Sequence, residues 1–234
     1  MAAPAAVRSS HPERAKRFEL LKARLSAMPP ALPVEGLVST AIPELDRLLG
    51  GGFPRGAVVT LEGLTGRWSL AAGLVARTTR CGLVAILDDG SLYPPALAEA
   101  GAALERILVV PARKALAAAR AADILLRSRI CRLILMPAVV LRDAVWERLA
   151  KLAHRSGALL IVVAARAGAA LSAAAGVRLH CALERILMHG GCGLWGSIAG
   201  FELSVDVRKH RNKMPGCAAR VRVEREESGD AALR

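Results

Sequence analysis

The residues with the clearest chemical potential stand at a glycine-containing turn after an apolar run, Glu62-Gly63-Leu64-Thr65-Gly66-Arg67-Trp68-Ser69-Leu70. A phosphate-binding loop has the spacing G-x-x-x-x-G-K-[ST], so that backbone N–H groups surround a phosphate while the lysine and the hydroxyl reach phosphate and Mg²⁺. Here Gly63 and Gly66 are only three positions apart, and Trp68 separates Arg67 from Ser69. A working cradle, a vestigial one and an ordinary turn at a helix start are the three interpretations. We predict the vestigial one, with no cofactor bound.

Other catalytic chemistry finds no support in the sequence. The motifs G-x-S-x-G and H-E-x-x-H are absent, and the histidines are scattered. Cys181 and Cys192 are candidate zinc ligands, but neither belongs to a C-x-x-C pair. We therefore expect buried, reduced cysteines, no metal site and no catalytic residue.

The composition excludes some function classes. Of 234 residues 53% are hydrophobic, which is enough for a full core and excludes wholesale disorder. Aromatic residues make up only 3% of the chain, which disfavours single-strand binding by stacked rings. Lys and Arg number 33 against 20 Asp and Glu, so the charge of +13 indicates a nucleic-acid or acidic partner.

No uncharged apolar run reaches the ~18–20 residues of a membrane span, and no secretory signal is evident. We expect a cytoplasmic, nucleoid-associated protein.

The chain divides into three parts. For residues 1–35 the sequence predicts a flexible start, an amphipathic helix over 13–28 and a Pro-rich linker. For residues 36–225 it predicts a folded core, and for residues 226–234 a flexible tail. The helix has an apolar stripe of Phe18, Leu21, Leu25 and Met28 and a basic surface that includes Arg17, Lys22 and Arg24. Such a helix either docks on a partner or folds back on its own domain.

The core shows an alternating βα pattern, which is typical of a parallel sheet covered on both faces. Apolar runs predict strands at 57–62, 83–88, 107–111, 132–136 and 158–165, and helical periodicity predicts helices at 69–80, 95–102, 114–127 and 141–155. Later segments, 177–188, 201–209 and 218–224, alternate without helices and predict an antiparallel extension of one edge. The fold class is therefore α/β, with a mainly parallel twisted sheet.

Several segments, in order, resemble RecA-type ATPases over residues 36–224. The stretch 36–56 (GLVSTAIPELDRLLGGGFPRG) is similar to the segment that leads into the first core strand of this family. LVAILD at 83–88 with Pro94-Pro95, GVRL at 176–179 and VRKHRNK at 207–213 are similar to later segments. The resemblance implies a RecA-like P-loop NTPase core with a degenerate nucleotide site.

The family's catalytic positions carry other residue types here. Its water-activating glutamate falls on Gly90, the Mg²⁺-holding acidic residue on Met136 or Pro137, and the polar γ-phosphate sensor near Ala164-Ala165. Hydrolysis needs these groups together with the phosphate loop. The first DNA loop would be nearly absent at 138–140, and the second, 166–175, would hold one arginine in a loop of Ala and Gly. The resemblance thus implies a pseudo-ATPase.

The remaining candidates are contact surfaces. A basic segment near the family's subunit interface is either a solvated turn or a contact for DNA or an acidic partner, and its cations are Arg208, Lys209, Arg211 and Lys213. The three tryptophans are expected in the core, although Trp195 in its Gly-rich turn would be a partner anchor if exposed.

A short RecA-like chain with a damaged phosphate loop resembles the ImuA family, accessory proteins of bacterial mutagenic translesion synthesis. This implies an SOS-induced, non-catalytic adaptor that binds ImuB, a polymerase-like protein without polymerase activity. It further implies contacts with RecA, with a DnaE-type error-prone polymerase and, weakly, with DNA, and self-association. Two alternatives stay open: a SulA-type cell-division inhibitor, and a RecA-like ATPase with an unorthodox phosphate loop.

Overall fold

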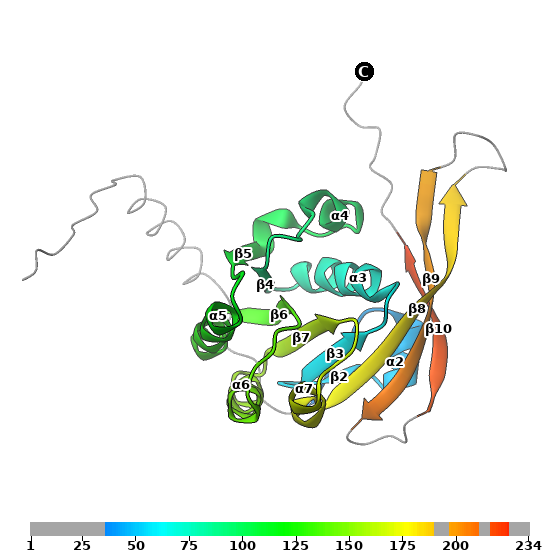
Figure 1. Cartoon of the computed structure of the whole chain (residues 1–234). Helices are drawn as coiled ribbons and strands as arrows, with labels where there is room; N and C mark the ends of the chain where they lie inside the picture. Colours follow the sequence, from blue (N-terminus) through cyan, green and yellow to red (C-terminus); the bar gives the residue numbers. More distant parts are fainter. Residues whose placement is uncertain (1–35, 190–196, 211–215, 225–234) are drawn as a thin grey trace, which may run out of the picture. The chain divides into compact units, whose positions relative to one another are not determined.

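The core of the protein is an eight-stranded mixed sheet (Figure 1). The computed structural model describes residues 36–189, 197–210 and 216–224. The strand order is β10-β9-β8-β3-β7-β6-β4-β5, parallel from β5 to β8 and antiparallel from β8 to β10. The strands are β3 (Val58–Glu62), β4 (Leu83–Asp88), β5 (Ile107–Pro111), β6 (Cys131–Pro137), β7 (Leu159–Ala164), β8 (Val177–His189), β9 (Ser197–His210) and β10 (Ala218–Glu224). A separate two-stranded sheet pairs β1 (Leu37–Val38) with β2 (Phe53–Pro54).

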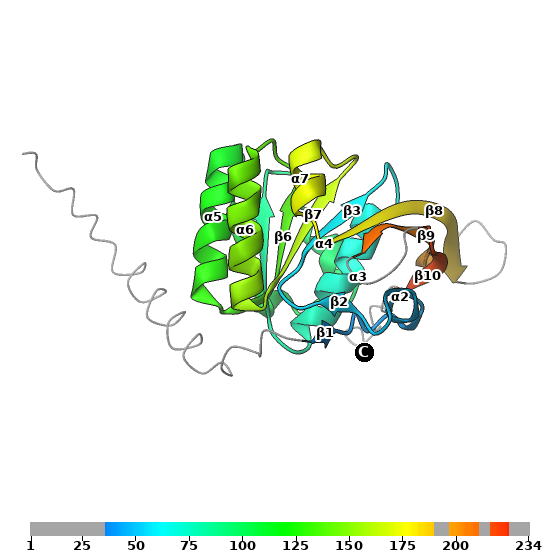
Figure 2. The ribbon, with the colours of Figure 1, turned by 90° about the horizontal axis from the view of Figure 1, so that it is seen from below.

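Helices cover both faces of the sheet (Figure 2). One hydrophobic core joins the sheet to α2 (Pro43–Leu49), α3 (Arg67–Thr79) and α4 (Pro94–Glu99). The other joins it to α5 (Ala115–Ser128), α6 (Asp143–Ser156) and α7 (Ala169–Ala174). A short 3₁₀ turn, Leu104–Arg106, precedes β5.

Local sequence accounts for these elements. The run Leu159–Ala164 is buried at every position, as a central strand between two helical layers requires. Pro43 stands at the first position of α2, where its fixed φ suits a helix start and the missing N–H costs nothing. Gly50 and Gly157 end α2 and α6 in the left-handed conformation, each with φ of 74°.

The structure confirms the predicted fold class, including the antiparallel edge. Two helices escaped prediction. α2 was missed because its seven residues are too few to show a helical period. The loop expected at 166–175 contains α7, which Lys209 holds by donating from Nζ to the carbonyl oxygens of Ser172 and Ala173.

Candidate functional site

The turn between β3 and α3 lies against the neighbouring strand β8. The N–H of Gly63 donates to the carbonyl oxygen of Ala165 at 3.1 Å. The hydroxyl of Thr65 accepts from the N–H of Leu183 at 3.1 Å. Gly63 has φ of 127°, and a Cβ at this position would stand 2.0 Å from the carbonyl oxygen of Cys181. The turn is therefore closed down onto β8, with no room for a side chain at Gly63.

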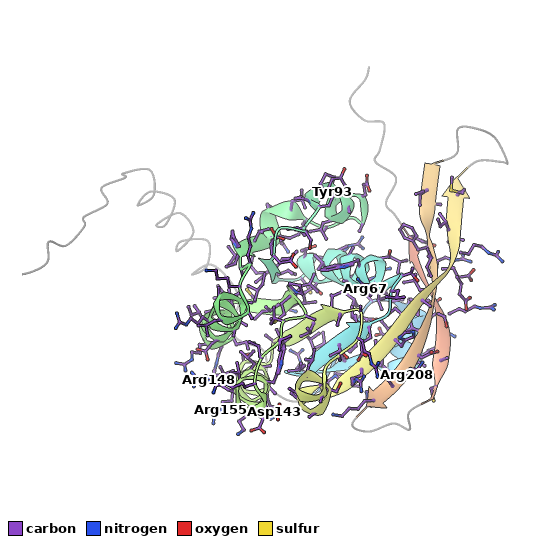
Figure 3. The ribbon with its side chains drawn as sticks, in the orientation of Figure 1. Arg67, Tyr93, Asp143, Arg148, Arg155 and Arg208 are labelled. Carbon is purple, nitrogen blue, oxygen red and sulfur yellow. The ribbon has the colours of Figure 1, made fainter. Side chains whose placement is uncertain are left out.

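The side chain of Arg67 binds the backbone of this turn. Its Nη1 donates to the carbonyl oxygens of Gly63 and, at 2.6 Å, of Leu64. Figure 3 places Arg67 between α3 and β8. A phosphate cradle turns N–H groups toward an anion, whereas this turn presents two carbonyl oxygens to a cation. Carbonyl oxygens repel phosphate oxygens, so the local polarity is the reverse of the one that phosphate needs.

A buried ion pair stands beside the turn at the end of β3. Glu62 is 5% exposed and meets Arg178 of β8 in a bidentate arrangement, with Nε–Oε1 at 2.8 Å and Nη2–Oε2 at 3.0 Å. The carboxylate also accepts from the hydroxyl of Thr60 at 2.9 Å and from the N–H of Ala167 at 3.2 Å. Four donors therefore use the two oxygens, and the pair clamps β3 to β8 and to the chain after β7.

The environment of Glu62 favours its ionised form. Burial by itself would raise the pKa, but the hydrogen bonds from Arg178, Ala167 and Thr60 and the charge of Arg178 outweigh it, so the pKa lies below its ordinary value. The nearby Cys181 thiol responds in the opposite way. Burial, with the charges of Asp206 and Glu62, raises its pKa to about 12, although Arg67 opposes this. Cys181 therefore stays a neutral thiol at physiological pH.

Sequence reasoning missed the Glu62–Arg178 pair, although a signal was present. Glu62 ends one apolar strand and Arg178 interrupts another, and a buried charge in such a run calls for an opposite charge nearby. Which charge pairs with which depends on the strand order.

The ends of the neighbouring strands hold the residues that the sequence comparison with RecA-type ATPases pointed to. Met136 is fully buried in β6, and Ala164 is buried at the end of β7. Gly90 lies in the turn after β4, where Asp88 accepts from the N–H groups of Gly90 and Leu92. Asp89 likewise accepts from the N–H and hydroxyl of Ser91. The two aspartates thus shape a turn.

The β8–β9 hairpin extends past β3 (Figure 1), because β3 pairs with β8 only up to the Glu62–His180 pair. Ile186 pairs with Phe201 and Met188 with Ile198, so these side chains share one face of the hairpin. Ile186 is 48% and Met188 52% exposed. We call the set Ile186, Met188, Ile198 and Phe201 the hairpin face. Its apolar character is unusual for side chains that meet water.

The predicted contact residues have separate locations. Arg208 is exposed on β9, 3.4 Å from Asp206, and Lys209 is bound to α7 as described above. The helix residues Phe18, Leu21, Leu25, Met28, Arg17, Lys22 and Arg24, and also Trp195, Arg211 and Lys213, lie outside the described residues. Ser69 is half-buried in the first turn of α3. Trp146 is a core residue as expected, whereas Trp68 was expected in the core and is 41% exposed.

The described residues include four free cysteines. Cys131 and Cys181 are buried free thiols as expected, but Cys81 and Cys217 are exposed. Among residues 36–189, 197–210 and 216–224, no three His, Cys, Asp or Glu side chains gather as a metal site would require. No helix in the described part of the chain is both long and apolar enough to cross a bilayer.

Comparison with known proteins agrees with this architecture. The chain is 34% identical over 99 residues to Protein RecA from Picosynechococcus sp. (strain ATCC 27264 / PCC 7002 / PR-6), a stretch that covers 41% of this chain and only 28% of that RecA. The crystal structure of the RadB recombinase superposes with a TM-score of 0.61 at 19% identity, over 80% of this chain and 96% of that one, which shows a shared RecA-like fold. The family model described as the MT3502 N-terminal domain matches residues 46–185, from α2 into β8. This protein, a RecA-like chain by fold, therefore belongs to the MT3502 N-terminal domain family.

Proposed function

We propose that this protein is a non-catalytic RecA-like adaptor in error-prone translesion DNA synthesis, of the ImuA type, whose main partner is ImuB. The observation that carries the proposal is the closed turn, whose carbonyl oxygens at Gly63 and Leu64 bind Arg67. A RecA-like core with this turn retains surfaces for binding while its centre for nucleotide chemistry has the wrong polarity.

The other catalytic positions support the same view. Phosphoryl transfer needs positioned Mg²⁺ and an oriented water as well as a phosphate cradle. Met136 and Ala164 offer no oxygen ligand from their side chains, and the four hydrogen bonds to Glu62 leave no free carboxylate oxygen beside the turn. The nucleotide-binding alternative would need several of these features to rearrange together.

The first prediction concerns nucleotide. We expect Mg–ATP, titrated to millimolar concentration, to leave the melting temperature of this protein unchanged, because a ligand raises it only by binding the folded state. Differential scanning fluorimetry measures this, with a RecA that has an intact phosphate loop as positive control. A rise of several degrees would refute the pseudo-ATPase proposal and favour a working, unorthodox loop.

The hairpin face supports a protein partner. Exposed apolar side chains are commonly the anchors of partner surfaces. The charged pairs Arg185–Glu202, 3.9 Å apart, and Arg220–Glu184, 2.9 Å apart, lie on the opposite face of the hairpin, so one face is charged and the other apolar. Leu64 and Trp68 add exposed apolar surface at the turn that contacts Leu183.

The second prediction tests this surface. Replacing Ile186 by aspartate should weaken ImuB binding at least about tenfold, because a central apolar contact is worth about 1–2 kcal/mol or more. Ile124→Asp on α5 is the matched control, since Ile124 is an equally apolar side chain that is 67% exposed elsewhere. Surface plasmon resonance with immobilised ImuB measures both. Failure of the unaltered chain to bind ImuB would reject the translesion role, and cell filamentation on overexpression would instead favour the division-inhibitor alternative.

A further inference from the structure

Several lysine and arginine side chains stand on α5 and α6, two of the helices that cover one face of the sheet. α5 and α6 lie side by side on that face (Figure 2). The two helices hold five Lys or Arg and three Asp or Glu. The cations are Arg120, Arg127, Arg148, Lys151 and Arg155, and the surplus is two. The basic character of this surface therefore depends on how the cations are placed on it.

Two adjoining hollows shape this surface. The first has a volume of about 410 Å³, and its charged lining residues are Arg127, Glu147, Arg148, Lys151 and Arg155. The second, about 260 Å³, lies at the amino end of β3 and is lined by Arg55, Lys151 and His154 without any acidic residue. Because Lys151 lines both hollows, they adjoin across α6. The result is a continuous basic surface rather than a scatter of single cations.

Much of this charge is not neutralised within the protein. One carboxylate, Asp123, lies 2.9 Å from Arg127 and 2.7 Å from Arg148. Its single negative charge therefore balances only half of the positive charge of these two guanidinium groups. Lys151 and Arg155 have no ion pair or side-chain hydrogen bond in the described part of the chain. The buried Nη1 of Arg55 likewise makes no hydrogen bond to any described residue. Figure 3 shows Arg148 and Arg155 on the outer side of α6.

We propose that this surface, which we call the α5–α6 track and define as Arg55, Arg127, Arg148, Lys151 and Arg155, binds the sugar-phosphate backbone of duplex DNA. Arginine presents a planar fork of donors that matches phosphate oxygens, and four of the five residues are arginines. Along α6, Arg148 and Arg155 are about 10 Å apart at a rise of ~1.5 Å per residue, so they contact successive parts of an extended polyanion.

The lining of the hollows selects among anionic partners. Neither hollow is lined by Phe, Tyr or Trp, and His154 supplies a single imidazole ring, so the track lacks the row of stacking platforms on which single-stranded DNA depends. It also lacks the aromatic anchors that are typical of protein interfaces. A duplex backbone needs neither, since its affinity comes from phosphate neutralisation. The inference goes beyond the proposed adaptor function and does not depend on ImuB.

The test uses the full chain and a fluorescently labelled duplex oligonucleotide of mixed sequence. Fluorescence anisotropy gives the dissociation constant over a series of salt concentrations. Replacing Lys151 and Arg155 together by glutamine should weaken binding about tenfold at low salt. It should also reduce the slope of log K against log salt by about two, since each lost phosphate contact removes about one.

The matched control removes the same net charge at the opposite edge of the sheet. Arg47→Gln in α2 with Arg222→Gln in β10 alters two exposed cations, and α2 contacts β10 there. We expect its slope to equal that of the unaltered chain. Equal slopes for all three proteins, equal losses in both double variants, or tighter binding of a single strand than of the duplex would each overturn the proposal. Circular dichroism checks folding, and the single variant Lys151→Gln, with a slope lower by about one, repeats the test if the double variant melts early.

Discussion

Replacing Gly63 by alanine is expected to lower the free energy of unfolding by at least about 4 kcal/mol, which is large enough to unfold a domain of ordinary stability. The added Cβ would stand 2.0 Å from the carbonyl oxygen of Cys181. That oxygen belongs to the backbone of β8, so relief requires the turn to move away from the strand next to β3. The turn is also held by the hydrogen bond from Gly63 to Ala165, which such a movement would break. Urea unfolding followed by circular dichroism measures the loss.

Substitutions at two other glycines separate the steric clash of the added Cβ from the backbone strain of a positive φ. Gly66 also has positive φ, 76°, but its Cβ would meet the side-chain Cδ2 of the buried Leu203 at 2.9 Å and backbone only at 3.2 Å, the N of Leu183. Gly216 has φ of 99° with nothing within 4 Å, so its substitution reports backbone strain alone. We expect Gly216→Ala to cost about 1–2 kcal/mol, Gly66→Ala slightly more, and Gly63→Ala the most. If Gly63→Ala cost no more than Gly216→Ala, the turn would not be pressed onto β8 as described.

Replacing Glu62 by glutamine is expected to cost about 3 kcal/mol at neutral pH, because it leaves the partly buried Arg178 without its counter-charge. The loss should depend on pH. The folded-state pKa of Glu62 lies below its ordinary value of 4.5, so its contribution to stability is complete above that value. The contribution disappears as the pH falls through the lower, folded-state pKa. The difference in unfolding free energy between the two proteins should therefore shrink in acid.

The control for Glu62 is an ion pair of similar length at the surface. Glu184 and Arg220 are 2.9 Å apart, and their side chains are 35% and 75% exposed. Glu184→Gln should cost at most about 1 kcal/mol, as is usual for an exposed pair. Adding Arg178→Gln to Glu62→Gln should recover part of the loss, since it removes the unpaired charge. Equal costs at Glu62 and Glu184, or a Glu62 cost that does not vary with pH, would contradict the clamp described for β3 and β8.

The clamp and the closed turn act in the same place. Glu62 precedes Gly63 directly, and both fix the end of β3 against β8. The substitutions at these two neighbouring positions are therefore expected to be non-additive, because breaking either contact already releases the other. The same rigidity keeps Arg67 on the carbonyl oxygens of Gly63 and Leu64, which connects the stability of the sheet to the polarity of the turn.

The residue types at the turn and at the ends of the neighbouring strands are set by the sequence. The short spacing from Gly63 to Gly66 and the non-acidic residues Gly90 and Met136 are properties of the sequence itself. The direction in which the Arg67 side chain points is not determined by the sequence alone. A guanidinium on a flexible side chain could reach solvent or the turn, and the packing of β8 against the turn decides between them.

Sequence by itself determined the order, type and approximate bounds of the strands of the main sheet and of the longer helices, because apolar periodicity is a local property of consecutive residues. The two-residue strands β1 and β2 are too short to show such a pattern. The run 159–164 and the helix over 143–156 are examples that neighbouring residues specify alone. Only the tertiary structure decided that Glu62 meets Arg178, 116 positions away, and that Arg55 joins cations of α5 and α6 on one surface. Contacts between residues far apart in the chain depend on the strand order and on which face of the sheet each helix covers. The hydrophobic pattern of a single segment determines neither.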